Sequence, residues 1–171
     1  MQSNVTTSLS TKSDSYFFTE KCIQRDLEKI KINIQDSPII FIDPIDDNYS
    51  HLEAAITGPM STPYENGTFL LHLKISEEYP YKPPQSITFK RATMHPNIDE
   101  YGNFMSELFN LESWSPAMTI KSILEHVWAR LAIPNIDSNE CDPTRAQLYR
   151  TDKHQFELIA REYSIKYANA T

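Results

Sequence analysis

Apolar residues recur at helical spacing near both ends of the chain and alternate with polar residues in the middle. In the first part, the apolar residues at helical spacing are Ile23, Leu27, Ile30 and Ile34. Such residues share one face of a helix, so we expect an amphipathic helix from about Thr19, with Thr19 as its N-cap. Residues 1–15 are polar, Ser/Thr-rich and without periodicity. They predict a disordered tail, followed by one domain over residues 16–171.

Short apolar runs between Pro38 and Phe89 predict a meander of four antiparallel strands. The runs are Ile39–Ile42, Leu52–Thr57, residues 69–75 and Ile87–Phe89. The third run alternates apolar and polar residues, which is typical of a half-buried strand. Asn66-Gly67 before it indicates a hairpin turn, and the prolines between the third and fourth runs exclude regular pairing there.

Helical spacing returns after Pro116. The apolar residues that follow it are Ile120, Ile123, Leu124, Val127, Trp128 and Leu131. So wide an apolar face predicts a central, buried helix, which Pro134 ends. A last helix is expected from about Asp152. The order of elements predicts an α+β domain with an N-terminal helix, a four-stranded antiparallel meander, a central buried helix and C-terminal helices.

Composition and charge exclude several classes of function. The net charge of −7 argues against a nucleic-acid-binding surface. No apolar run approaches the roughly 18 residues that cross a membrane, and residues 1–15 contain no apolar signal core. We therefore expect no membrane association and a cytoplasmic and/or nuclear location. The two cysteines, Cys22 and Cys141, cannot form a zinc site by themselves, and we expect neither a metal ion nor a cofactor.

Five short motifs occur in a fixed order along the chain. They are Thr62–Gly67, Tyr79–Pro84, His95–Ile98, Trp114–Ala117 and Pro134–Asn135. Each is weak alone, but their order and approximate spacing resemble those of ubiquitin-conjugating enzymes, and the resemblance extends from about Thr19 to the end. It implies that family's α+β fold (the UBC fold) and a place in the pathway of ubiquitin or a ubiquitin-like modifier.

The resemblance places the catalytic cysteine ten residues after His95 and three after Gly102, where this chain has Met105. Counting back from Trp114 by the family's commonest interval leads to Ser106 instead, because this stretch has one extra residue. We favour Met105, since some relatives carry an insertion just before the tryptophan. Neither residue is a cysteine. A thioether has no ionisable proton and gives no thiolate, so Met105 cannot form a thioester.

Three other interpretations of the nucleophile remain open. Ser106 can form an oxyester, but a serine needs a general base, and this motif contains no second histidine or paired carboxylate. Ser106 can also be an engineered replacement of a cysteine. Cys141 lies in a loop longer than the family's usual one, and its acidic neighbours raise the pKa of the thiol.

The residues around the nucleophile position allow both catalytic and structural roles. Asn97 matches an asparagine that the resemblance links to oxyanion and loop stabilisation, and its amide either donates to an oxyanion or bonds backbone groups. His95 is interpreted as a loop histidine with satisfied hydrogen bonds. Glu107 is interpreted as a solvated charge.

The resemblance also implies docking positions for partners. A RING-type ligase would contact two loops, at Tyr81, Lys82, Ser115, Pro116 and Ala117. The activating enzyme would contact basic residues of the first helix, Lys21 and Arg25 among them, although Cys22 replaces a second basic residue there. An aromatic beside prolines suits an interface anchored by few side chains. Alternatively, the prolines only shape the loops and Tyr81 covers the local core.

Three hypotheses of function follow. The favoured one is a variant that binds a ligase, a modifier or an active conjugating enzyme without thioester activity. The second is an active transferase that uses Ser106 or Cys141. The third is a scaffold unrelated to ubiquitin, because a fold alone does not fix a function.

Overall fold

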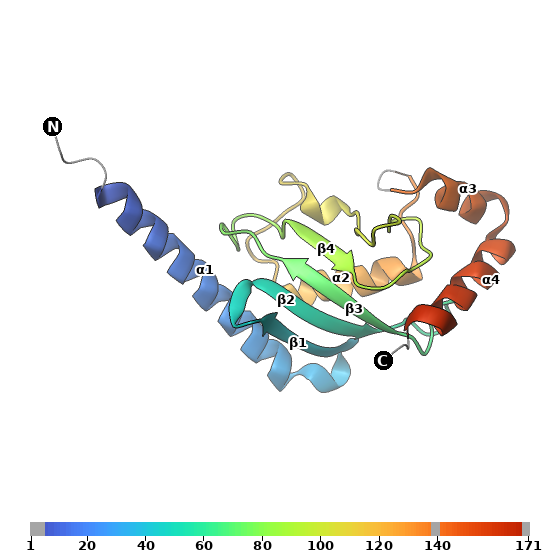
Figure 1. The fold of residues 1–171 in the computed structure, drawn as a ribbon, viewed down its shortest axis with the longest axis horizontal. Helices are drawn as coiled ribbons and strands as arrows, with labels where there is room; N and C mark the ends of the chain where they lie inside the picture. Colours follow the sequence, from blue (N-terminus) through green and yellow to red (C-terminus); the bar gives the residue numbers. More distant parts are fainter. Residues whose placement is uncertain (1–5, 138–140, 169–171) are drawn as a thin grey trace.

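The computed structural model describes residues 6–137 and 141–168. Its centre is one antiparallel sheet in the order β1-β2-β3-β4, as the meander predicted. The strands are β1 (Ile39–Ile45), β2 (Asn48–Thr57), β3 (Thr68–Lys74) and β4 (Ser86–Phe89); the helices are α1 (Thr6–Ile32), α2 (Ile120–Ala132), α3 (Pro143–Thr151) and α4 (Lys153–Tyr163). Figure 1 shows α2 behind the sheet, with α1 at one end of the molecule and α3 and α4 at the other.

The core lies between the sheet and α2. On this face of the sheet, Leu52 of β2 stands opposite Leu73 of β3, which in turn stands opposite Ile87 of β4. The α2 side chains that face them are buried: Ile120, Ile123, Leu124, Val127 and Leu131. Burying each such side chain contributes about 1.5–3 kcal/mol. The prediction of a central buried helix is confirmed.

The first helix differs from its predicted bounds. It begins at Thr6, so it covers residues 6–15 of the segment predicted as a disordered tail; residues 1–5 lie outside the described residues. Thr19 is not its N-cap but lies inside the helix, where its hydroxyl shares one proton between the carbonyl oxygens of Glu77 and Tyr79, both at 2.9 Å. The segment lacks glycine and proline, and polarity alone does not stop a helix.

A buried carboxylate joins α1, α2 and the loop after β3. Asp26 of α1 is 3% exposed, and its Oδ2 accepts a hydrogen bond from the Tyr79 hydroxyl at 2.5 Å. The same oxygen accepts the N–H of Ile120, the first residue of α2, at 3.3 Å. An acceptor at a helix N-terminus satisfies a backbone donor that has no partner within the helix. Asp26 therefore fixes the loop that begins at Tyr79.

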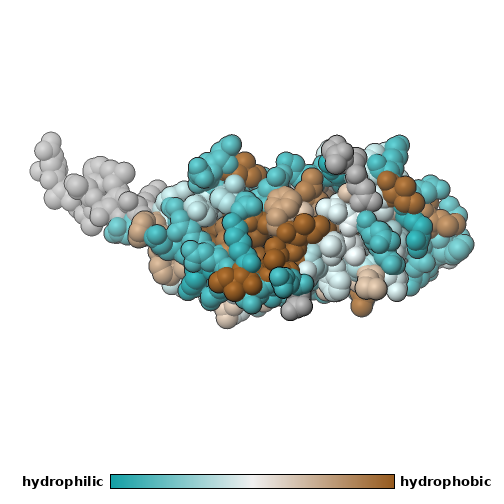
Figure 2. Space-filling model, turned by 90° about the horizontal axis from the view of Figure 1, so that it is seen from below, coloured by the Kyte–Doolittle hydropathy of each residue, from teal (hydrophilic) through white to brown (hydrophobic). Residues whose placement is uncertain are grey.

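Figure 2 shows hydrophilic residues over most of one face and apolar residues gathered near its middle. Among the described residues, no helix combines the length and the hydrophobicity that spanning a bilayer requires.

Candidate active site and docking surface

The segment between β4 and α2 contains the loop that carries the predicted nucleophile position, and its shape is fixed by local contacts. Asp99 accepts the N–H of Asn103 at 2.8 Å. Gly102 has a φ of +87°, and a Cβ at this position would lie 2.2 Å from the carbonyl oxygen of Phe89. Only glycine fits such a backbone and such an approach. The loop therefore presents the residues after Gly102 in one orientation.

His95 ties this loop to the end of α2. It is fully buried, and its Nε2 lies 2.9 Å from the carbonyl oxygen of Arg130. Because a carbonyl only accepts, Nε2 carries the proton, and Nδ1 accepts the N–H of Asn97 at 3.0 Å. Burial lowers the pKa of His95 to about 3, so the ring is neutral at neutral pH. Both nitrogens have bonds, as the interpretation of a loop histidine requires.

Asn97 joins the loop to the segment that follows α2. Its side chain is fully buried; Nδ2 donates to the carbonyl oxygen of Asn135 at 2.6 Å, and Oδ1 accepts the N–H of Asn135 at 2.9 Å. Its own carbonyl accepts the N–H of Met105 at 2.9 Å. The amide was expected either to donate to an oxyanion or to bond backbone groups, and these contacts are of the second kind.

Met105 and Ser106 differ sharply in exposure. The Met105 residue is 48% exposed, whereas Ser106 is 6% exposed. The backbone at Ser106 is extended, with φ −155° and ψ 152°, and consecutive side chains of an extended segment point to opposite sides. The thioether therefore lies at the surface of the loop, and the hydroxyl faces α2.

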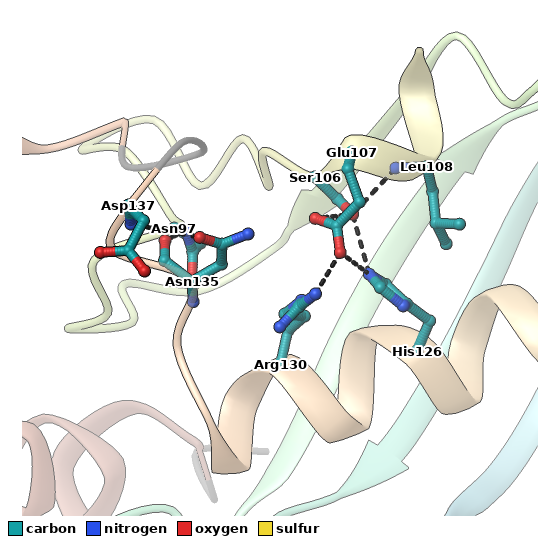
Figure 3. A network of polar contacts seen from close by, with 8 residues as sticks. All are labelled: Asn97, Ser106, Glu107, Leu108, His126, Arg130, Asn135 and Asp137. Atoms are coloured by element: carbon teal, nitrogen blue, oxygen red, sulfur yellow. Dashed lines mark hydrogen bonds and ion pairs between the residues drawn. The ribbon is translucent and has the colours of Figure 1, made fainter. Parts of the chain in front are cut away.

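Ser106 belongs to a polar network with two residues of α2 (Figure 3). Its Oγ lies 2.8 Å from Nε2 of His126. It also accepts the N–H of Leu108 at 3.2 Å and so caps the short 3-10 turn Glu107–Phe109. Arg130, one helical turn after His126, forms an ion pair with Glu107. The interpretation of Glu107 as a solvated charge is therefore wrong, because α2 places a guanidinium against it.

At neutral pH this network contains a neutral imidazole beside an ion pair. Burial lowers the pKa of His126, although the nearby Glu107 carboxylate opposes this effect. Burial raises the pKa of Glu107, but hydrogen bonds from its own backbone N–H and from Arg130 hold it below its usual value. A neutral imidazole beside a hydroxyl is the pairing that activates a serine. However, the Glu107 carboxylate lies 3.9 Å from the same Nε2, not beside Nδ1 as in a catalytic triad.

His126 is the site residue that the sequence analysis missed. It lies on α2, far along the chain from Ser106. One signal was present: His126 and Arg130 are polar and four residues apart, so they share a face of the helix. Nothing in that spacing connects this face with Ser106.

Cys141 lies against the same loop but is a poor nucleophile. It is half-buried, and its Sγ lies 3.6 Å from the carbonyl oxygen of Pro96. Burial, followed by the charges of Asp99 and Asp142, raises the pKa of the Cys141 thiol to about 11. The predicted direction of the shift is confirmed, although burial is its largest cause. At neutral pH the residue is a thiol, the unreactive form.

The two predicted ligase-docking loops are joined to each other and to α1. Nε1 of Trp114 donates to the carbonyl oxygen of Pro80 at 2.8 Å, which ties the second loop to the first. Tyr81 is 64% exposed and stacks on Phe18 of α1, with ring centroids 6.2 Å apart. Tyr81 therefore does not cover the core, and this part of the alternative is wrong. We name the exposed residues Phe18, Tyr81, Lys82, Ser115, Pro116 and Ala117 the docking surface.

The basic residues of α1 beside the docking surface are exposed. Lys21 lies over the ring of Phe17, 5.3 Å from its centroid, and Arg25 lies 3.8 Å from Asp26. In the first loop, Lys82 pairs with Glu78 at 2.6 Å. The Lys82–Glu78 pair is exposed and contributes little to stability, so these two side chains can exchange partners at small cost.

A comparison with known protein families agrees with this architecture. The sequence matches the family model of the ubiquitin-conjugating enzyme over residues 22–164. The chain therefore belongs to the ubiquitin-conjugating enzyme family, and the resemblance inferred from its motifs is confirmed. Its α+β architecture is the UBC fold of that family. Proteins of this family act together with ubiquitin and ligases.

Proposed function

We propose that this protein is a ubiquitin-conjugating-enzyme variant that binds partners of the pathway and carries no modifier on a thiol. The observation that carries the proposal is the exposed Met105 at the surface of the loop after Gly102. A thioether supplies no thiolate, so thioester formation has no nucleophile at this position. His95 and Asn97 keep the loop in place through hydrogen bonds that do not involve the Met105 side chain.

The docking surface supports the partner-binding half of the proposal. It presents an aromatic pair, Phe18 and Tyr81, beside the small exposed residues 115–117. Interfaces of modest size draw most of their binding energy from a few such anchors. A RING-type ligase is the partner that this surface suits best. A modifier or an active conjugating enzyme are further partners of the same function.

Ser106 with His126 is the second candidate, because a neutral imidazole lies 2.8 Å from its hydroxyl. In that reaction, Oγ would attack the carbonyl carbon of a modifier thioester, the hydroxyl proton would pass to His126 Nε2, and the carrier's thiolate would leave. The 6% exposure of Ser106 opposes this, since attack requires the loop to open. A cysteine at this position would face α2 in the same way, which also argues against an engineered replacement.

A charging assay separates these hypotheses. The purified chain is incubated with activating enzyme, ubiquitin and ATP, and adducts are resolved on reducing and non-reducing gels. We expect no adduct. A hydroxide-labile, reductant-stable adduct that is lost in both Ser106→Ala and His126→Gln would establish the serine enzyme. A reductant-sensitive adduct lost in Cys141→Ser would establish Cys141 as the nucleophile.

A binding assay separates the pathway-binding variant from an unrelated scaffold. Binding of RING domains is measured by calorimetry for the wild type, Tyr81→Ala and Tyr163→Ala. The control removes a tyrosine of α4, at the opposite end of the molecule (Figure 1). We expect at least one RING domain to bind, with affinity reduced about tenfold or more by Tyr81→Ala and unchanged by the control. Equal affinities of all three proteins would contradict the assignment of the docking surface.

A further inference from the structure

Two histidines meet on the face of the sheet that turns away from α2. His51 lies on β2 and His72 on β3, and Glu53 of β2 stands directly opposite His72. Residues two apart on a strand, and residues directly opposite across strands, share one face. The three side chains therefore form one cluster on the face of the sheet that turns away from α2. Figure 1 shows the ribbon of the sheet in front of α2.

The two imidazoles face each other through one nitrogen each. Nδ1 of His51 and Nε2 of His72 are 3.0 Å apart, whereas the ring centroids are 5.2 Å apart with planes inclined by 13°. Because these two nitrogens are closer to each other than the ring centroids are, they lie on the edges by which the two rings face each other. One ring donates its N–H to the lone pair of the other, so a single proton separates the two nitrogens.

The separation of these nitrogens matches that of two ligands on one metal ion. Nitrogens at about 2.0–2.1 Å from a metal, at ligand angles between square-planar and tetrahedral, lie about 2.8–3.4 Å apart. We propose that His51 and His72 form a two-histidine site for a divalent first-row transition ion of the Zn²⁺, Ni²⁺ or Cu²⁺ type, with solvent completing the coordination. This inference is independent of the proposed function.

The chain can present both lone pairs to a metal ion through a change of tautomer and a rotation of each ring. The proton between the rings moves to the outer nitrogen of the ring that carried it, which is a change of tautomer without net proton release. Each ring turns about its χ2, a torsion with broad wells, until both lone pairs converge. The strands hold the two Cα atoms in place, so most of the ordering cost of a chelate is met by the fold.

Three charged side chains surround the pair, one acidic and two basic. The Glu53 carboxylate lies beside it and is 3.3 Å from Lys90 Nζ, while Lys74 is exposed opposite His51. Among the described residues, no group of three or more His, Cys, Asp or Glu is placed to hold a metal ion. The proposed site therefore has two protein ligands.

The test uses Zn²⁺ as the probe and the full chain without a histidine tag at about pH 7.5, where imidazole is mainly neutral. Calorimetry measures Zn²⁺ affinity for the wild type, His51→Gln, His72→Gln and the control His154→Gln, which removes an exposed histidine of α4. We expect His51→Gln and His72→Gln each to reduce the affinity at least tenfold, and the control to leave it unchanged. Circular dichroism confirms that each variant is folded.

Imidazole ¹⁵N spectra of the wild type provide a second measurement that needs no variant. With Zn²⁺ we expect shifts at Nδ1 of His51 and at Nε2 of His72, the two nitrogens that face each other. Unchanged spectra of both rings at saturating Zn²⁺ would overturn the proposal. So would an equal Zn²⁺ affinity of the wild type and both site variants, because the metal would then bind elsewhere.

Discussion

Acid should destabilise this protein through His95, and the size of the effect follows from its burial. The unfolded chain protonates His95 below about pH 6.5, whereas the folded chain excludes this proton down to about pH 3. Between these values the unfolded state binds more protons. The stabilisation is therefore complete above about pH 6.5 and is lost progressively as the pH falls towards 3. In the fold, a proton on Nδ1 would oppose the N–H of Asn97, which donates to that nitrogen.

Between about pH 7.5 and pH 5.5, this one histidine should lower the free energy of unfolding by about 1.4 kcal/mol. Urea denaturation at both pH values measures it for the wild type, for His95→Gln and for the exposed-histidine control His154→Gln. On acidification, we expect the free energy of unfolding of His95→Gln to fall by about 1.4 kcal/mol less than that of the wild type or of His154→Gln. The reasoning is refuted if His95→Gln loses as much stability as the wild type, or if the His95 ring in the folded wild type titrates near pH 6.5.

Three substitutions test other contacts by urea or thermal unfolding. Tyr79→Phe removes the hydrogen bond to Asp26 and should cost about 1.5–3 kcal/mol; an unchanged unfolding midpoint would show that this buried bond has no net value. Gly102→Ala should lower the free energy of unfolding by at least about 1–2 kcal/mol, because φ is +87° and the new Cβ meets the Phe89 carbonyl. A variant as stable as the wild type would contradict the loop geometry. Asn97→Ala removes two hydrogen bonds to the backbone of Asn135 and should lower the free energy of unfolding by about 1–3 kcal/mol. An unchanged free energy of unfolding would be the result if the amide served catalysis alone.

The fold could be predicted largely from the sequence because its elements have strong local signals. The alternation in β3 and the wide apolar face of α2 each determine one type of structure. The start of α1 was missed because a polar segment without glycine or proline is compatible with both tail and helix. No range was predicted for α3, which buries only Ala146; its signals were the N-cap Asp142 and Pro143 at the first turn.

The site could be predicted only where it depends on neighbours along the chain. The motif around His95 indicated the loop, and the resemblance to the family led from Gly102 to Met105 as the expected nucleophile position. The contacts between Ser106, Glu107 and α2 could not be predicted, because they depend on how the loop packs on a helix further along the chain. The same holds for the histidine pair on the outer sheet face, which only the strand register brings together.

The most direct test of the central claim is the charging of two single-cysteine replacements. Met105→Cys places a thiol at the exposed position, and Ser106→Cys places one at the buried position that faces His126. Both are incubated with activating enzyme, ubiquitin and ATP beside the wild type. We predict a reductant-sensitive adduct on Met105→Cys and none on Ser106→Cys or the wild type. Charging of the wild type, or of Ser106→Cys in place of Met105→Cys, would contradict the account.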